Sequence, residues 1–142
     1  MIVSTKGRYA MRVMIDMAQH NGEGPIPLKE IADRQGISEK YLEAILRALV
    51  EHKIVSGVRG RDGGYSLLRD PSELTAWEVI FAVEKDFYAV TCLSPGADTC
   101  KRERECAVLP MWREFYETVK DFFGKYTIQD LAEGISDNSV IV

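Results

Sequence analysis

The sequence predicts a mainly α-helical fold that contains one β-hairpin, and three observations support this. Apolar side chains recur three and four positions apart in several stretches, which is the spacing of amphipathic helices. Two short runs, 54–59 with three β-branched residues and 65–68 that begins with a tyrosine, flank a glycine-rich segment and are typical of paired strands. A last apolar stripe over residues 108–122 carries several large aromatic side chains and indicates a long helix near the C-terminus.

Length and composition limit the class of protein. The 142 residues suffice for one domain with an extension, and 46% hydrophobic with 28% charged residues is typical of a soluble globular protein. No stretch approaches the roughly 18 consecutive apolar residues of a membrane span, and the first eight residues lack the apolar core of a signal peptide. We therefore expect a cytoplasmic protein that has no membrane partner.

The charge is distributed unevenly along the chain. The net charge of −4 argues mildly against binding to nucleic acid. However, residues 1–70 carry 11 Lys and Arg against 9 Asp and Glu, whereas residues 71–142 carry 7 against 13. Only the first half can approach phosphate, and it must do so through a few well-placed cations.

The first half contains the pattern of a helix-turn-helix. After a first amphipathic helix over residues 6–20, a short helix with one apolar face over residues 28–35 ends at Gly36. Ser38 is a natural N-cap for the next helix, whose apolar residues are again three and four apart. The tight turn with its glycine matches a helix-turn-helix, although a plain helical hairpin would look the same.

The hairpin that follows makes the pattern more specific. A helix-turn-helix followed directly by two strands is a winged helix-turn-helix, here a three-helix core plus a two-stranded β-wing over residues 1–70. Arg59 and Arg61 lie near the glycine-rich tip, where a wing would contact phosphates or a minor groove. A plain hairpin with solvated arginines is the alternative.

The second half of the chain is predicted to join the winged helix-turn-helix to that of a second copy. Thr75 and Glu78 form a capping box that opens a connecting helix within residues 71–87. We expect a loop over residues 88–106, then a long dimerisation helix and a short terminal helix, capped by Thr127 and Asp130, over residues 107–134. Its large aromatic side chains indicate packing against a second copy in a homodimer, with burial inside the monomer as the alternative. Residues 135–142 are expected to be a flexible tail.

Residues at the start of the second helix of a helix-turn-helix reach base edges. Lys40 can donate to guanine O6 and N7 or to phosphate, and Glu43 can accept from cytosine N4 or repel a wrong sequence. A solvated helix face is the alternative for both residues. The predicted DNA contacts are Ser38, Lys40, Tyr41, Glu43, Arg59 and Arg61.

The three cysteines, Cys92, Cys100 and Cys106, fall within fifteen positions of one another. An odd number in a reducing compartment argues against disulfides. Thiolates hold iron–sulfur clusters and zinc, but both normally take four ligands, so unligated or redox-active thiols also remain open. A small iron–sulfur electron carrier is disfavoured because it would not need a winged helix. No catalytic set of residues or phosphate-binding loop is present, so we expect no enzyme.

The combined motifs resemble the Rrf-type family of bacterial winged-helix transcription regulators over residues 1–134. The resemblance implies a homodimer that binds double-stranded promoter DNA at palindromic sites, usually as a repressor, with no enzymatic activity. It also implies base and groove contacts at positions 40 and 43 and at Arg59; a small hydroxyl residue is frequent in the family where Lys40 stands. The segments that carry the resemblance are Ser4 to Ala10, Ile37 to Glu43 and Val58 to Tyr65.

The resemblance also bears on the cysteines. Cluster-binding members carry three cysteines in this loop, which implies that Cys92, Cys100 and Cys106 hold an iron–sulfur cluster, of the 2Fe–2S or 4Fe–4S type, that modulates operator binding. The alternative is a cofactor-free regulator controlled by a partner protein or by thiol oxidation.

The fourth cluster ligand departs from the family pattern. Some members have a histidine where this sequence has Leu109, and others use an acidic residue of the partner chain where this sequence has Arg8. The candidates near the cysteines are Asp98, Glu103 and Glu105.

Overall fold

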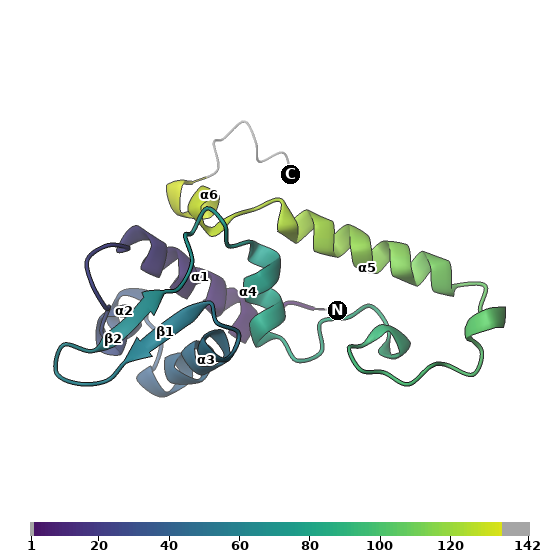
Figure 1. The fold of residues 1–142 in the computed structure, drawn as a ribbon, viewed down its shortest axis with the longest axis horizontal. Coiled ribbons are helices and arrows are strands. Elements are labelled where there is room, and N and C mark those ends of the chain that lie inside the picture. Colours follow the sequence, from purple (N-terminus) through teal and green to yellow (C-terminus); the bar gives the residue numbers. More distant parts are fainter. Residues whose placement is uncertain (1, 135–142) are drawn as a thin grey trace.

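The structure, a computed structural model, describes residues 2–134 and has the predicted mainly helical fold with one antiparallel hairpin (Figure 1). The predicted tail, residues 135–142, lies outside the described residues. Two short 3-10 turns, at Thr91–Leu93 and Glu103–Glu105, interrupt the predicted loop. The helices and strands are α1 Thr5–Gln19, α2 Leu28–Gln35, α3 Glu39–Glu51, β1 Val55–Val58, β2 Gly64–Leu67, α4 Ala76–Val83, α5 Leu109–Gly124 and α6 Ile128–Glu133.

Helices α1 and α3 begin at side-chain caps that the sequence encodes. The Ser4 hydroxyl accepts a hydrogen bond from the Gly7 amide at 3.3 Å, and the predicted cap Ser38 accepts one from the Tyr41 amide at 3.2 Å. Each cap satisfies an amide that the first turn of a helix leaves without a partner. The apolar faces behind these caps form one core, whose largest fully buried side chains include Met14, Met17, Ile31, Leu42, Ile45, Leu46 and Leu49.

A buried carboxylate joins α1 to α2. Asp16 is only 2% exposed, and its two oxygens accept hydrogen bonds from the Arg34 guanidinium at 2.9 and 2.7 Å. The Gln35 side-chain amide donates a third, at 2.9 Å. Burial raises the pKa of Asp16, but the hydrogen bonds from Arg34 and Gln35 and the charges of Arg34 and His20 outweigh it, so the pKa lies below its ordinary value. Asp16 is therefore ionised in the folded protein at neutral pH.

This ion pair fixes the start of the turn that orients α3. Gly36 follows Gln35 directly and has φ +64°, the left-handed conformation that glycine adopts without strain. Ile37 then enters the core, and its amide donates to the Ala32 carbonyl at 3.1 Å. The predicted glycine turn and apolar corner residue are both confirmed.

The chain returns to this core near its C-terminal end. Both predicted capping boxes, Thr75 with Glu78 and Thr127 with Asp130, are present. The segments before α4 and α6 also pair, since the Ile128 amide donates to the Leu74 carbonyl at 2.8 Å. Leu74 and Ile128 are fully buried in the same core as α1 to α3, so that core continues past residue 70.

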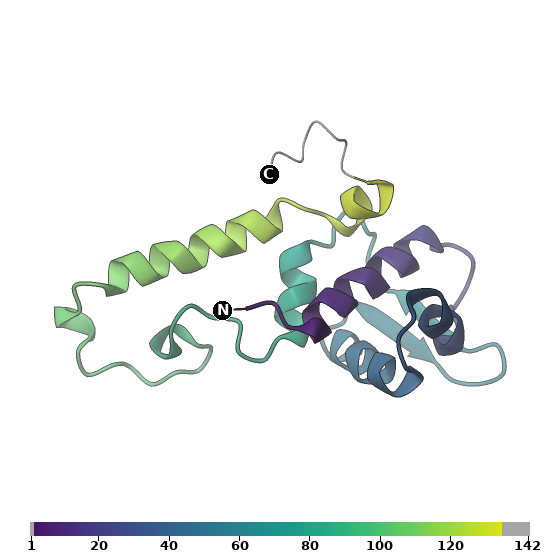
Figure 2. The same cartoon turned by 180° about the vertical axis from the view of Figure 1, so that it is seen from behind.

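Helix α5 stands apart from the winged helix and runs as a long rod beside the loop that precedes it (Figures 1 and 2). One side of α5 faces α4, where Tyr116 lies edge-on to Trp77 with ring centroids 5.7 Å apart. The apolar residues on its other side stay exposed, as described below. In residues 2–134 we find no helix with the length and apolar character needed to cross a membrane.

Replacing Asp16 with Asn should lower the free energy of unfolding by about 3 kcal/mol, the low end of the range for removing one partner of a buried ion pair, because Arg34 is partly exposed. The ionised Asp16 stabilises the fold above its unfolded pKa of about 3.9, and this contribution is lost as the pH falls through the lower folded pKa. The difference between wild type and Asp16→Asn, measured by urea unfolding, should therefore shrink below about pH 4.

Glu30→Gln provides the control. The Glu30 carboxylate also lies near Arg34, at 3.7 Å, but it is solvent-exposed, and such pairs contribute little. Equal losses for Asp16→Asn and Glu30→Gln at neutral pH would contradict the role assigned to Asp16.

Candidate DNA interface and cysteine loop

The exposed start of α3 carries the residues predicted to read bases. Lys40 and Glu43 are solvent-exposed, as expected for a face that meets a ligand. Tyr41 is half-buried, and its ring lies edge-on to that of Tyr9 with centroids 5.8 Å apart. Tyr41 and the N-cap Ser38 therefore also have structural roles in holding α3, whatever they contribute to binding.

A groove lies between α3 and the wing, with a volume of about 560 Å³; we call it the wing groove. Of the predicted contacts, Glu43 comes from α3, and Arg59 and Arg61 come from the wing. Arg47 and Glu51 on α3 complete its charged lining. The predictions omitted these two residues, although both stand at steps of four from Glu43, the spacing of one helix face.

The glycines of the wing have a packing role that their sequence did not reveal. Gly64 is the first residue of β2, and a Cβ placed there would lie 2.3 Å from the Ile26 carbonyl oxygen. A Cβ on Gly63 would lie 2.2 Å from the Val58 carbonyl oxygen. Tyr65 then exchanges two backbone hydrogen bonds with Ile26, at 2.8 and 2.9 Å. These contacts set the wing close against the segment before α2.

The structure brings together two of the three cysteines. Cys92 and Cys100 line one hollow of about 190 Å³, the cysteine hollow, and Cys106 is not part of its lining. Cys92 and Cys100 are exposed, and Cys106 is half-buried. Among the residues that the structure describes, no three His, Cys, Asp or Glu side chains stand close enough together to bind one metal ion. The donors thus match thiolate-bound clusters in type, but their arrangement is not preformed.

The candidate fourth ligands divide in the same way. Asp98 and Glu103 line the cysteine hollow, whereas Glu105 does not. Glu103 accepts a hydrogen bond from the Arg113 guanidinium at 3.0 Å, so its carboxylate is already paired. Leu109, which stands where some family members have a histidine, also lines this hollow. The departure from the family pattern therefore falls at a position that faces the thiols.

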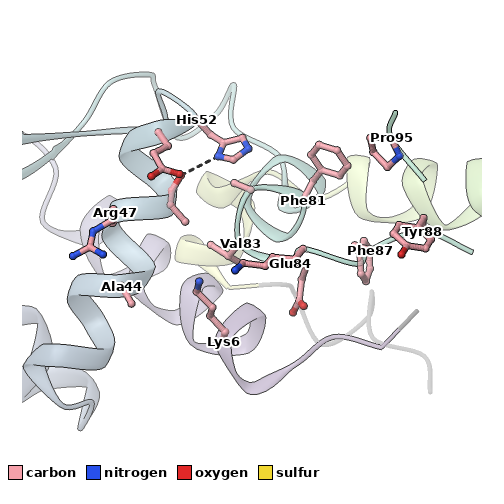
Figure 3. Close-up of a pocket in the computed structure, with 14 residues that line it drawn as sticks. Lys6, Ala44, Arg47, His52, Phe81, Val83, Glu84, Phe87, Tyr88 and Pro95 are labelled. Atoms are coloured by element: carbon pink, nitrogen blue, oxygen red, sulfur yellow. Dashed lines mark hydrogen bonds between the residues drawn. The ribbon is translucent and has the colours of Figure 1, made fainter. Parts of the chain in front are cut away.

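A second cavity of about 470 Å³ connects this loop to α3, and we call it the junction cavity (Figure 3). Tyr88 and Pro95 of the loop lie on one side, and Ala44 and Arg47 of α3 lie on the other. Lys6 of α1 and the end of α4 complete it. Helix α3 and the loop of residues 88–106, which we call the cysteine loop, therefore share the walls of one cavity.

A helix-turn-helix with an adjoining wing, and with charged side chains exposed on both, defines a winged-helix DNA-binding transcription regulator. Comparison with known proteins agrees with this class. Residues 3–134 match the Rrf2 family, described as iron-dependent transcriptional regulators, and the chain belongs to that family. The members of this family are named transcriptional regulators and not enzymes, in agreement with the prediction of no enzymatic activity.

Curated relatives and solved structures place the chain within the family. It is 40% identical over 131 residues to the HTH-type transcriptional regulator IscR of Photorhabdus laumondii, covering 92% of this chain and 79% of that protein. The structure of T. potens IscR superimposes with a TM-score of 0.71 at 30% identity, covering 100% of this chain and 93% of that one. CymR, the global cysteine regulator of B. subtilis, gives a TM-score of 0.72 at 33% identity, with 96% and 99% covered.

Gly64→Ala should displace the wing, because a methyl group there would overlap the backbone of Ile26 and no flexible side chain can move aside. We expect loss of DNA binding, measured by fluorescence anisotropy, with little change in helical content by circular dichroism. Gly124→Ala is the control, since a Cβ at that position meets no atom within 4 Å. Unchanged DNA binding by Gly64→Ala would show that the close packing of the wing is not needed.

Proposed function

We propose that this protein is a homodimeric repressor of IscR type that binds palindromic promoter DNA through α3 and the wing, and whose operator binding depends on an iron–sulfur cluster held by Cys92, Cys100 and Cys106. The observation that carries the DNA-binding mode is the wing groove, where Glu43 of the recognition helix faces Arg59 and Arg61 of the wing. Lys40 is exposed one turn before Glu43 on α3 and supplies a further donor. Base edges and phosphates would be contacted together.

The exposed face of α5 supports the homodimer. Val108, Met111, Phe115 and Phe122 are between 45% and 52% exposed. They stand three, four and seven positions apart, the spacing of a helix seam that packs against another helix. A second copy would bury this seam by two-fold symmetry. Two recognition helices would then meet two half-sites of one palindrome.

The composition of the cysteine loop supports the cluster. Three soft thiolates in one loop are the usual ligands of iron–sulfur clusters, and two of them already line one hollow. When bound, a cluster supplies a labile inorganic centre that is sensitive to iron supply and to oxidants. Asp98 is the fourth ligand that we favour, because it lines the cysteine hollow and, unlike Glu103, makes no ion pair within 4.0 Å among the described residues.

The junction cavity supports a link between the loop and DNA binding. A change in the order of residues 88–106 would move Tyr88 and Pro95, which share this cavity with α3. It would also alter the start of α5 and hence the separation of the two recognition helices in a dimer. Half-site spacing is a strict geometric requirement, so a small change there alters operator affinity.

Arg59→Ala should weaken binding to every duplex by about tenfold, because it removes a contact with the DNA phosphate backbone and not a contact with a base. Each lost phosphate contact lowers the slope of log Kd against log salt by about 0.9, so a dimer should lose about 2. A titration at several salt concentrations measures both quantities. Lys125→Ala, at the end of α5, should change neither. If Arg59→Ala retains the parent salt slope, the wing does not contact the backbone.

Replacing any one cysteine with Ser should abolish the visible absorbance and lower the iron and sulfide content of protein purified without air, because each thiolate supplies one ligand. Thr99→Ala is the control, since Thr99 lines the cysteine hollow without a thiol. Asp98→Ala should destabilise the cluster, whereas Glu105→Ala should not. Normal iron and sulfide in all three cysteine variants would contradict the assignment.

A further inference from the structure

A stripe of three charged residues runs along the exposed face of α3. Glu43, Arg47 and Glu51 stand four positions apart, so they share one side of the helix. The Arg47 guanidinium lies 3.7 Å from the Glu43 carboxylate, measured from Nη2 to Oε1. In the described part of the chain, Glu51 makes no ion pair within 4.0 Å. Arg47 thus pairs with the carboxylate nearer the start of the helix.

The position of Arg47 gives this pair a relation to DNA. All three residues line the wing groove, opposite Arg59 and Arg61. Without Arg47, the only charges on the α3 side of the groove would be the two carboxylates, which a polyanionic duplex repels. Figure 3 shows the Arg47 guanidinium on the outer side of α3, directed away from Tyr88 and Pro95 of the junction cavity. Arg47 also lines the wing groove, so its charge is available there.

The ion pair between Glu43 and Arg47 is weak enough for each side chain to exchange its partner for a group of the DNA. Its side chains are 69% and 58% exposed, and ion pairs of this kind contribute little to stability. A guanidinium forms stronger, bidentate hydrogen bonds with phosphate. A carboxylate that loses its guanidinium partner next to DNA needs another donor, because an unpaired anion there is repelled. Cytosine N4 is the major-groove donor suited to a carboxylate.

We propose that Arg47 is a specificity-determining residue that couples base reading by Glu43 to a phosphate contact. In the free protein Arg47 holds the Glu43 carboxylate. Where a cytosine faces Glu43, the carboxylate accepts from its N4 amino group and Arg47 moves to a phosphate. Where another base stands there, the Glu43–Arg47 pair persists and the phosphate contact is not made. This inference rests on the proposed function of α3. It adds a residue that makes the affinity for the DNA backbone depend on the base sequence.

The test compares salt slopes on two duplexes. The first is the preferred duplex selected from a random library by the full-length protein. The second is the same duplex in which the symmetric C·G pairs that face Glu43 are changed to T·A. These pairs are identified by replacing each base pair of the preferred duplex in turn. Wild-type protein should show a slope of log Kd against log salt that is steeper by about 2 on the first duplex, one phosphate contact per protomer.

Variants then distinguish a phosphate contact that depends on the base facing Glu43 from a phosphate contact that Arg47 makes on any duplex. Arg47→Ala should lower the slope by about 2 on the preferred duplex and leave it unchanged on the substituted one. Glu43→Gln removes the charge that holds Arg47, so the two duplexes should give equal, steep slopes. Glu51→Gln, a matched control on the same stripe without an ion pair, should keep the wild-type difference.

The outcomes that would overturn the inference are distinct. An equal loss of slope on both duplexes for Arg47→Ala would make Arg47 an ordinary phosphate contact. No loss on either duplex would place it outside the interface. In both cases a preferred duplex exists and the proposed function stands. Failure of the selection to yield any preferred duplex would instead refute the proposed function, and the inference with it.

Discussion

The buried Asp16 carboxylate is the constraint on which the arrangement of the DNA-binding half depends. It receives hydrogen bonds from two consecutive residues of α2, Arg34 and Gln35, directly before the turn at Gly36. The Arg12 side chain on α1 reaches the same place and donates to both the side chain and the backbone of Gln35. An ion excluded from water must keep its partners, so the end of α2 cannot slide along α1. The direction in which α3 leaves the turn is thereby fixed.

The two ends of the described chain then close the other side of the core. The Glu84 carboxylate, at the end of α4, accepts hydrogen bonds from the Ser4 amide and hydroxyl at 2.8 and 2.7 Å. Gly7 leaves room for it, since a Cβ there would lie 2.3 Å from Glu84 Oε1. The glycine in the first turn of α1 thus has a physical reason. Together with the pairing of Leu74 and Ile128, these contacts hold α4 and α6 against α1.

The sequence predicted what depends on neighbouring residues and missed what depends on distant ones. Caps such as Ser38 and Thr75 act within three positions, so the helix starts were predicted well. The partners of Asp16 lie eighteen and nineteen positions away, and no local pattern indicated that it is buried. The sequence indicated that Gly64 belongs to the hairpin tip, yet a Cβ at Gly64 would lie against the backbone of Ile26, far away in the sequence. Cysteine spacing likewise could not show that Cys106 stands outside the hollow of Cys92 and Cys100.

The apolar stripe of α5 shows the same limit of prediction from local sequence. The periodicity predicted one apolar stripe over residues 108–122. The structure divides the apolar residues of α5 between two faces. Tyr116 and Phe123 pack toward Trp77 and Phe87 of the α4 side, whereas Phe115 remains exposed. A helix that is apolar over more than one face buries only the part that meets its neighbour, here α4. Only the position of α4 decides which residues are left for a partner.

The cysteine loop is anchored at both ends and weakly held between them, and this determines how it can act on the rest of the molecule. Phe87 is buried against Trp77 of α4 and Phe123 of α5, with ring centroids 5.6 and 6.1 Å apart, and Leu109 is buried at the start of α5. Residues 98 to 105 between these anchors are exposed. A segment with few buried contacts changes its order at little cost, whereas its anchors cannot move without their neighbours. Tightening the loop would therefore act through Phe87 and Leu109 on the packing of α5 against α4. That packing sets how the winged helix is held relative to the exposed apolar face of α5.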